Sequence, residues 1–386
     1  MKQRKWYLSI IVFILSALLL DACSFSVEVM TPGPTAPATF TSVPSSASPT
    51  PVPFTLIAPS VTPTLIPIRG DTIYMLEVFK SFALNDIVRS VAFTPDGTVL
   101  AAAGGNTEDF AIHLWDVASG QSLGTLNGHT GIVWGVAFSL DGKLLASVSS
   151  DKTAKVWDWR TGTVIKSLDF PGEVVSVSFS PDGQNLAVGG VDEPQNQVQN
   201  AAIWTYSVDS WAAQVKFPEF LDIAALAYSP KGGTLIGGGT SRNVQVWRAS
   251  DGAPVFTLSH AHQVSKAAIS PDGSTVATAT CQTVANSECT EGGVWLWDLP
   301  SGKLIKKLAG FPDIVENVAF SADGSILIAA SRSGILRFYT TSDYQSKFET
   351  TSPGGISALT LSPDGGLLAT GSNNGAVNLW RVVYRP

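Results

Sequence analysis

The sequence has few charged residues, few reactive side chains and no pattern of a long helix. Only 14% of its 386 residues are charged, the net charge is -7, and there are three cysteines and four histidines. No basic stripe is present, which excludes nucleic acid as a partner because such binding needs clustered Lys and Arg. No Gly-x-Ser-x-Gly, phosphate-loop or HExxH motif occurs. We therefore expect a protein without catalytic activity, cofactor or metal.

The residues that are abundant indicate an all-β protein. The chain contains 35 glycines, and 45% of its residues are hydrophobic. This composition is typical of many short strands joined by tight turns around a large core.

The first 22 residues have the pattern of a signal peptide. A basic start is followed by an apolar segment from Leu8 to Leu20, which is shorter than the roughly 20 residues that span a bilayer. Leu20-Asp21-Ala22-Cys23 resembles the lipobox of bacterial lipoproteins, although Asp21 departs from it. The resemblance implies lipidation of Cys23 and an exported protein, anchored at the outer face of a bacterial cell membrane or extracellular. An ordinary signal peptide or an uncleaved anchor is the alternative.

Residues 23–70 are expected to form a disordered linker. No Lys, Arg, Asp or Glu occurs from Val29 to Ile68, and ten of the 23 prolines fall there among Ser and Thr. Such a segment cannot offset the entropy lost on ordering, so it stays semi-extended. We interpret it as a tether for a folded domain at residues 71–386.

A tight turn recurs seven times in this domain. Ser or Thr usually precedes a Pro-Asp-Gly or related tripeptide, which joins two β-rich stretches as a hairpin. The turns are at Pro95-Asp96-Gly97, Leu140-Asp141-Gly142, Pro181-Asp182-Gly183, Pro230-Lys231-Gly232, Pro271-Asp272-Gly273, Ala322-Asp323-Gly324 and Pro363-Asp364-Gly365. A repeat of this period predicts an array of identical β units.

Each turn is followed by a strand that ends on an aromatic residue. These residues are Trp115, Trp157, Trp204, Trp247, Trp297, Tyr339 and Trp380. The distance from the middle turn residue is 16 positions in copies two, four, six and seven, but 19, 22 and 25 in copies one, three and five. We therefore expect insertions between the second and third strands of these three copies.

The pattern resembles the WD40 repeat family, and copy two matches it best. The resemblance implies a seven-bladed β-propeller of four-stranded antiparallel blades. It also implies that copy two contains the family's structural hydrogen-bond network, formed by His129, Ser147, Asp151 and Trp157. Residues 74–82 precede blade one, whereas blade seven lacks a fourth strand. The family's closure implies that this N-terminal strand completes blade seven, which removes two open edges.

The remaining cysteines and histidines suggest structural roles. Cys281 and Cys289 lie in the insertion of copy five, where a disulfide is the simplest interpretation and a redox or zinc role the alternative. His260 and His262 are two possible metal ligands on one loop, which is weak support for a metal site.

The residues expected at the mouth of the central channel are candidates for partner binding. Trp134 occupies a position held in the other blades by Arg89, Val175, Ala224, Ser265, Glu316 and Ser357. An aromatic residue there is a typical binding anchor, with blade packing as the alternative. The insertions contain acidic residues and no Lys or Arg, which suggests an acidic face. The expected partner-binding set is Arg89, Trp134, Glu173, Asp222 and Glu316.

The sequence thus predicts an exported, membrane-tethered WD40-like propeller that acts as a protein-interaction or ligand-binding scaffold. We expect a monomer that binds a protein or peptide of basic character and contacts the membrane through its lipid anchor. The alternative is an extracytoplasmic propeller enzyme, a hydrolase or lyase, whose site lies at the same channel mouth.

Overall fold

The computed structural model describes residues 67–69, 76–105, 109–193, 200–220, 223–239 and 242–382, with the backbone only for 193 and 218–220. Contacts divide the chain into two units, Met1–Val52 and Pro53–Pro386. The expected signal peptide at 1–22 and Cys23 lie outside the described residues, and so does Asp222.

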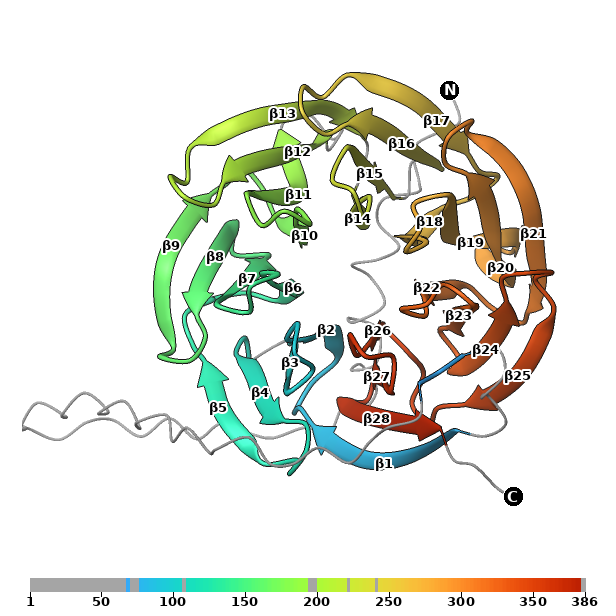
Figure 1. The fold of residues 1–386 in the computed structure, drawn as a ribbon, viewed down its shortest axis with the longest axis horizontal. Coiled ribbons are helices and arrows are strands. Elements are labelled where there is room, and N and C mark those ends of the chain that lie inside the picture. The colour runs from blue at the N-terminus through green and yellow to red at the C-terminus, as the bar shows by residue number, and fades with distance from the viewer. Residues whose placement is uncertain are drawn as a thin grey trace, which may run out of the picture. The chain divides into compact units, whose positions relative to one another are not determined.

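The second unit contains a ring of seven blades around a central channel (Figure 1). Each blade is a four-stranded antiparallel sheet, and the described residues contain no helix. The predicted all-β, seven-bladed propeller is therefore confirmed.

The strands run from the channel outward in each blade. Blades one and two contain β2 (Val88–Phe93), β3 (Val99–Gly104), β4 (Ile112–Asp116), β5 (Ser122–Leu126), β6 (Val133–Phe138), β7 (Leu144–Ser149), β8 (Thr153–Asp158) and β9 (Thr163–Asp169). Blades three and four contain β10 (Val174–Phe179), β11 (Asn185–Glu193), β12 (Asn200–Ser207), β13 (Ala213–Phe220), β14 (Ala225–Tyr228), β15 (Thr234–Gly238), β16 (Asn243–Arg248) and β17 (Pro254–Ser259). Blades five and six contain β18 (Val264–Ile269), β19 (Thr275–Ala285), β20 (Glu288–Asp298), β21 (Lys303–Phe311), β22 (Val315–Phe320), β23 (Ile326–Ser331), β24 (Ile335–Thr340) and β25 (Ser346–Thr351). Blade seven contains β26 (Ala358–Leu361), β27 (Leu367–Gly371), β28 (Ala376–Val382) and the N-terminal β1 (Leu76–Ala83).

The sequence of each strand reflects its depth in the blade. The second strands β3 and β23 are buried at every position, because neighbouring blades cover both of their faces. The outermost strand β9 is exposed at most positions. Apolar side chains of adjacent blades form shared clusters, so the core of the propeller lies between the blades.

The recurring turn has one geometry in six blades. In blade two, the Ser139 hydroxyl donates to the Asp141 carboxylate at 2.6 Å, and the Gly142 amide donates to the Ser139 carbonyl at 2.9 Å. Gly142 has a φ of 68°, which favours glycine. The equivalent donors to the turn aspartate are Thr94, Ser180, Ser270, Ser321 and Ser362. Lys231 replaces the aspartate in blade four.

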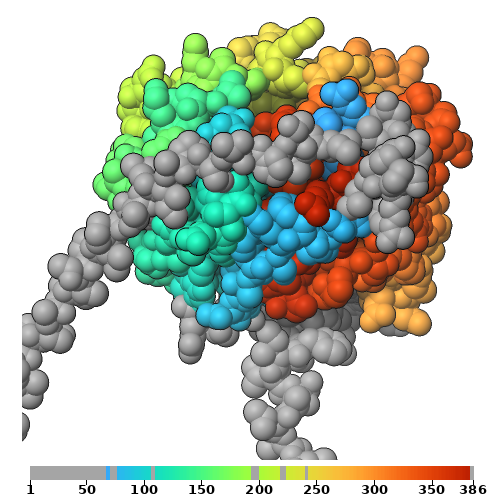
Figure 2. All heavy atoms as spheres, turned by 60° about the horizontal axis from the view of Figure 1, so that its bottom comes forward, coloured from blue at the N-terminus to red at the C-terminus, as the bar shows by residue number. Residues whose placement is uncertain are grey.

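The ring is closed by β1, as the sequence predicted. β1 pairs antiparallel with β28 from Leu76 to Ala83. In Figure 2 the blue atoms of β1 lie against the red atoms of the C-terminal strands. The rings of Phe82 and Trp115 stack with their centroids 4.9 Å apart, which links β1 to blade one as well.

Residues 67–69, which we assigned to the linker, contact the propeller. The Ile68 amide donates to the Gly365 carbonyl at 2.8 Å, and the Ile68 side chain is 1% exposed. Arg69 forms an ion pair with Asp323 at 3.6 Å. The chain is therefore held against the turns of blades six and seven before β1 begins.

Candidate functional site

The innermost strands contain a β-bulge at the position singled out in the sequence. The register shifts on either side of Arg89, Trp134, Val175, Ser265 and Glu316. A bulge leaves its extra residue outside the ladder and redirects the side chain. The same feature in five blades directs these side chains toward one end of the channel.

These positions line a cavity of about 590 Å³ at the channel mouth. All seven of the equivalent residues contribute to its wall, together with residues from the loops that share this face. The described lining residues are Arg89, Trp134, Val175, Ile223, Ala224, Ser265, Lys266, Glu316, Arg332, Ile356, Ser357 and Asn373. The volume of the cavity is in the range of about 300–1,000 Å³ that is usual for ligand sites.

Positive charges outnumber negative charges among these lining residues. Arg89, Lys266 and Arg332 are the cations, and Glu316 is the carboxylate. Arg332 Nε donates to Glu316 Oε1 at 2.7 Å. Burial lowers the pKa of Lys266 and of Arg89, while the nearby Glu316 carboxylate opposes both shifts. Glu316 thus acts on all three cations, and Asp86 also favours the charged form of Arg89.

Trp134 and Arg89 form a pair on neighbouring blades. The Arg89 guanidinium lies over the Trp134 ring, 4.8 Å from its centroid. Both side chains are partly buried, and the buried atoms Arg89 Nε and Trp134 Nε1 have no hydrogen-bond partner. An unpaired buried donor costs about 1–3 kcal/mol, so both atoms favour a ligand that supplies an acceptor.

The other members of the expected partner-binding set have different positions. Glu173 is exposed but does not line the cavity. Asp222 lies outside the described residues. Lys266, which the sequence reasoning missed, enters the wall beside Ser265. Strict alternation would place successive residues on opposite faces, and the bulge breaks that alternation.

Two acidic residues of the insertions have partners within the protein. In the insertions, Asp109 is bonded to His113 at 2.9 Å, and Asp192 is paired with Lys216 at 2.6 Å. Because Lys216 comes from outside the insertion, a count of charges within that insertion overestimates the negative charge around Asp192.

Blade two contains the hydrogen-bond network expected for its four residues. Trp157 Nε1 donates to Ser147 Oγ at 2.8 Å, and Ser147 Oγ lies 2.7 Å from His129 Nε2. His129 Nδ1 lies 2.8 Å from Asp151 Oδ2. Because the carboxylate accepts, Nδ1 carries the proton, and Nε2 then accepts from the serine hydroxyl. Burial lowers the pKa of His129.

Blade five contains a second, incomplete version that the sequence reasoning missed. Trp297 Nε1 donates to Thr278 Oγ1 at 3.2 Å, and Thr278 Oγ1 lies 2.8 Å from His260 Nε2. His260 Nδ1 donates to the Leu258 carbonyl at 3.1 Å, where blade two has an aspartate. His260 is thus a structural residue. The separation of 18 residues from histidine to hydroxyl, the same in both blades, was the signal that could have revealed it.

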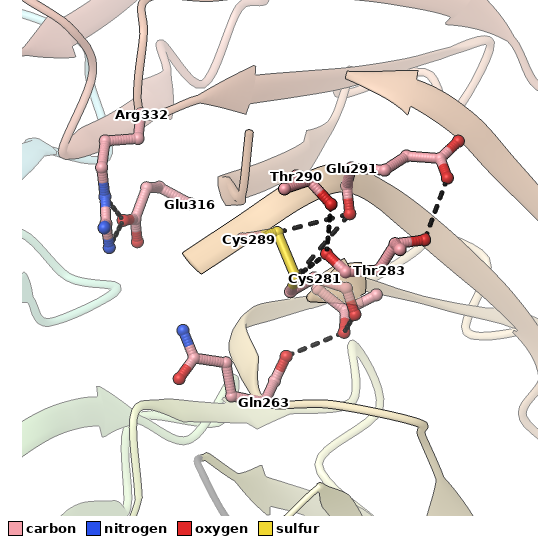
Figure 3. The surroundings of a disulfide bond; sticks show 9 residues. Gln263, Cys281, Thr283, Cys289, Thr290, Glu291, Glu316 and Arg332 are labelled. Atoms are coloured by element: carbon pink, nitrogen blue, oxygen red, sulfur yellow. Dashed lines mark hydrogen bonds and ion pairs between the residues drawn. A yellow bond between two sulfur atoms is a disulfide. The ribbon is translucent and has the colours of Figure 1, made fainter. Parts of the chain in front are cut away.

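Cys281 and Cys289 form a disulfide in the extended hairpin of β19 and β20 (Figure 3). Their Cα atoms are 5.8 Å apart. The Thr283 hydroxyl donates to the Glu291 carboxylate at 3.1 Å and joins the two strands near the bond. The insertion is therefore a braced hairpin, which lies near the Arg332–Glu316 pair of the mouth in this view.

We expect the double variant Cys281→Ser/Cys289→Ser to lose about 2 kcal/mol of unfolding free energy, because the unfolded chain is no longer constrained by the short loop. Thermal unfolding with and without a reductant measures the effect. The reductant should lower the melting temperature of the wild type and leave the double variant unchanged. An equal shift in both proteins would contradict the assignment.

The described residues contain no group of three His, Cys, Asp or Glu side chains that could hold a metal ion. In the same part of the chain, no helix is long and apolar enough to cross a membrane.

Comparison with protein families identifies the repeat. The model described as "WD domain, G-beta repeat" matches residues 77–116, 120–158, 162–193, 302–340 and 344–381. Each match begins near or on the outermost strand of one blade and continues into the inner strands of the next, which are those of blades one, two, three, six and seven. This seven-bladed propeller contains WD40 repeats. Blades four and five of this WD40 propeller are recognised from the structure, where they have the same four-stranded order.

Curated relatives of the WD40 propeller are fungal proteins. Periodic tryptophan protein 2 homolog of Schizosaccharomyces pombe is 37% identical over 30% of this chain and 14% of its own length. Eukaryotic translation initiation factor 3 subunit I of Aspergillus oryzae is 39% identical over 26% of this chain and 29% of its own length. Target of rapamycin complex subunit wat1 of Schizosaccharomyces pombe is 29% identical over 53% of this chain and 65% of its own length. The WD40 propeller therefore spans less than two thirds of each of these relatives.

These relatives correct the expected location. We expected an exported protein at the outer face of a bacterial cell membrane or outside the cell. That expectation is wrong, because the relatives are eukaryotic proteins, among them subunits of a translation initiation factor and of the target of rapamycin complex. The error arose from residues 1–23, whose short apolar segment and Cys23 were interpreted on sequence pattern alone.

Proposed function

We propose that this WD40 propeller is a protein-interaction scaffold that holds a segment of its partner at the channel mouth, with Trp134 as the anchor. The observation that carries this proposal is the convergence of seven equivalent strand positions on one cavity of about 590 Å³. Two curated relatives are named as subunits of multiprotein assemblies, which supports a role in binding proteins.

The alternative of a propeller enzyme receives less support from the mouth. An enzyme site usually contains several converging titratable groups with shifted pKa values. The described lining residues contain neither His nor Cys, and their one carboxylate, Glu316, is paired with Arg332. The two groups with shifted pKa values, Lys266 and Arg89, are both cations. This arrangement suits recognition better than proton transfer.

We also propose that residues 23–66 form a tether before the folded part of the chain. Their composition, rich in Pro, Ser and Thr and poor in charge, supports this role.

The scaffold function is tested with a Trp134→Ala variant in affinity capture from an extract of the source organism. Loss of a central aromatic anchor is expected to weaken partner binding by at least about 2 kcal/mol, or roughly 30-fold in the dissociation constant. Leu140→Ala is the matched control, because Leu140 lies in the same blade, in the turn after β6, and is 62% exposed. Thermal unfolding verifies that both variants are folded. Recovery of the same partners with equal affinity by Trp134→Ala would contradict the proposal.

A further inference from the structure

The charge of the mouth indicates a partner of a different kind from the one the sequence suggested. A basic partner would meet Arg89, Lys266 and Arg332, and the described lining residues offer it only the Glu316 carboxylate. Asp86 lies near enough to stabilise the charged form of Arg89, yet even with this second carboxylate the cations remain in excess among the described residues. Like charges across an interface disfavour binding, whereas opposite charges favour it.

The three cations differ in the groups that they contact within the protein. Arg332 donates to Glu316 through Nε at 2.7 Å, so its charge is already balanced. Lys266 Nζ donates to the Ala224 carbonyl at 3.2 Å, which is a neutral acceptor, while Glu316 favours its charged form through space. The Arg89 guanidinium faces the neutral Trp134 ring. Among the described cations of the mouth, Lys266 and Arg89 are therefore the two whose nearest contacts are neutral groups.

Hydrogen-bond donors at the mouth point to the same chemistry. The buried atoms Arg89 Nε and Trp134 Nε1 have no acceptor, and a lysine ammonium can donate up to three hydrogen bonds. A carboxylate only accepts, and it accepts several hydrogen bonds at once.

We propose that the channel mouth binds a carboxylate side chain of an acidic peptide segment, with Lys266 and Arg89 as the recognising cations. This inference rests on the proposed scaffold function and gives the chemistry of the partner. Glu316 acts in it as the internal competitor: its carboxylate balances part of the positive charge that the ligand would otherwise meet. The Trp134 ring supplies the apolar contact beside the bound acidic residue.

Removal of a cation and removal of the Glu316 carboxylate are expected to change peptide binding in opposite directions. Lys266→Met removes an attractive charge and is expected to weaken binding of an acidic peptide roughly tenfold, as for loss of one hydrogen bond to a charged group. Glu316→Gln removes the competing carboxylate and is expected to tighten binding several-fold. Lys231→Met, which removes one positive charge from an exposed turn outside the mouth, is the matched control and should leave binding unchanged.

The experiment is fluorescence polarisation with rhodamine-labelled hexaglutamate and, as the neutral counterpart, hexaglutamine. Wild type should bind hexaglutamate more tightly than hexaglutamine, and only hexaglutamate should respond to the Lys266 and Glu316 variants. Equal binding of the two peptides would overturn the proposal, and so would shifts of the same sign in Lys266→Met and Glu316→Gln.

The affinity capture experiment separates this inference from the scaffold function. If Trp134→Ala loses partners while the charge variants leave hexaglutamate binding unchanged, the scaffold function stands and the carboxylate inference fails. If Trp134→Ala keeps all partners with equal affinity, the scaffold function itself fails.

Discussion

A chain that begins at residue 84, and therefore lacks β1, is expected to lose most of the stability of the propeller. Without β1, the edge of β28 loses its partner from Ala376 to Val382. The side chain of Leu76 leaves the core between blades six and seven, and Phe79 and Phe82 leave the cluster between blades seven and one. At roughly 1.5–3 kcal/mol for each large apolar side chain, the loss is about 5 kcal/mol or more.

A loss of this size is comparable with the whole stability of a typical domain, which is about 5–15 kcal/mol. The effect should not remain local, because a ring with an open blade exposes strand edges to pairing with other chains. Circular dichroism and thermal unfolding should show either a far lower melting temperature or aggregation.

The matched control is a chain that begins at residue 67 and retains Ile68 and β1. It is expected to unfold at nearly the temperature of the full chain, because the described contacts of the propeller begin at residue 67. If the two truncated chains unfold at the same temperature, β1 does not close the ring.

The fold could be predicted from the sequence because the repeat supplies the same information seven times. The turn aspartates, the aromatic strand ends and the missing fourth strand of blade seven each constrain the topology independently. Closure by β1 followed from the family resemblance and from the missing fourth strand of blade seven, and Phe79 and Phe82 have the spacing of the apolar pair in the fourth strands of other blades. Short-range patterns were sufficient here since each blade is formed mainly from consecutive residues.

The site could be predicted only in part. The equivalent positions of Arg89, Trp134 and Glu316 were found because the repeat alignment places them in one ring. Lys266 was missed because a β-bulge cannot be seen in a sequence that otherwise alternates. The charge around Asp192, in the insertion of blade three, was overestimated for a related reason: Lys216 pairs with Asp192 from 24 residues away, on a different strand. Charge balance depends on tertiary contacts that a count within one loop does not include.

The second large effect is expected from His260, whose role also became apparent only in the structure. Burial lowers the pKa of His260 from 6.5 to about 4, and the positive charge of Lys307 adds to this effect. Lys307 Nζ lies 3.5 Å from the centroid of the Trp295 ring, which packs against His260. Protonation would place a second cation beside Lys307 and would make Nε2 a donor, so that it could no longer accept from Thr278.

The sign of the pH dependence follows from the two protonation equilibria. Above pH 6.5, the histidine is neutral in both the folded and the unfolded chain and contributes no pH dependence. As the pH falls below 6.5, the unfolded chain binds the proton first, so stability decreases until the folded pKa of about 4 is reached. The difference between the two pKa values corresponds to about 3 kcal/mol.

Chemical denaturation of the wild type and of His260→Gln at several pH values between 6.5 and 4 measures this contribution. The wild type should lose about 3 kcal/mol more than the variant over this range, since the glutamine does not titrate. His262→Gln is the control, because it removes a histidine two residues away from the network of Thr278 and Trp297. It should retain the acid sensitivity of the wild type. If all three proteins lose stability in parallel, the acid sensitivity arises elsewhere and His260 is not held neutral by its burial.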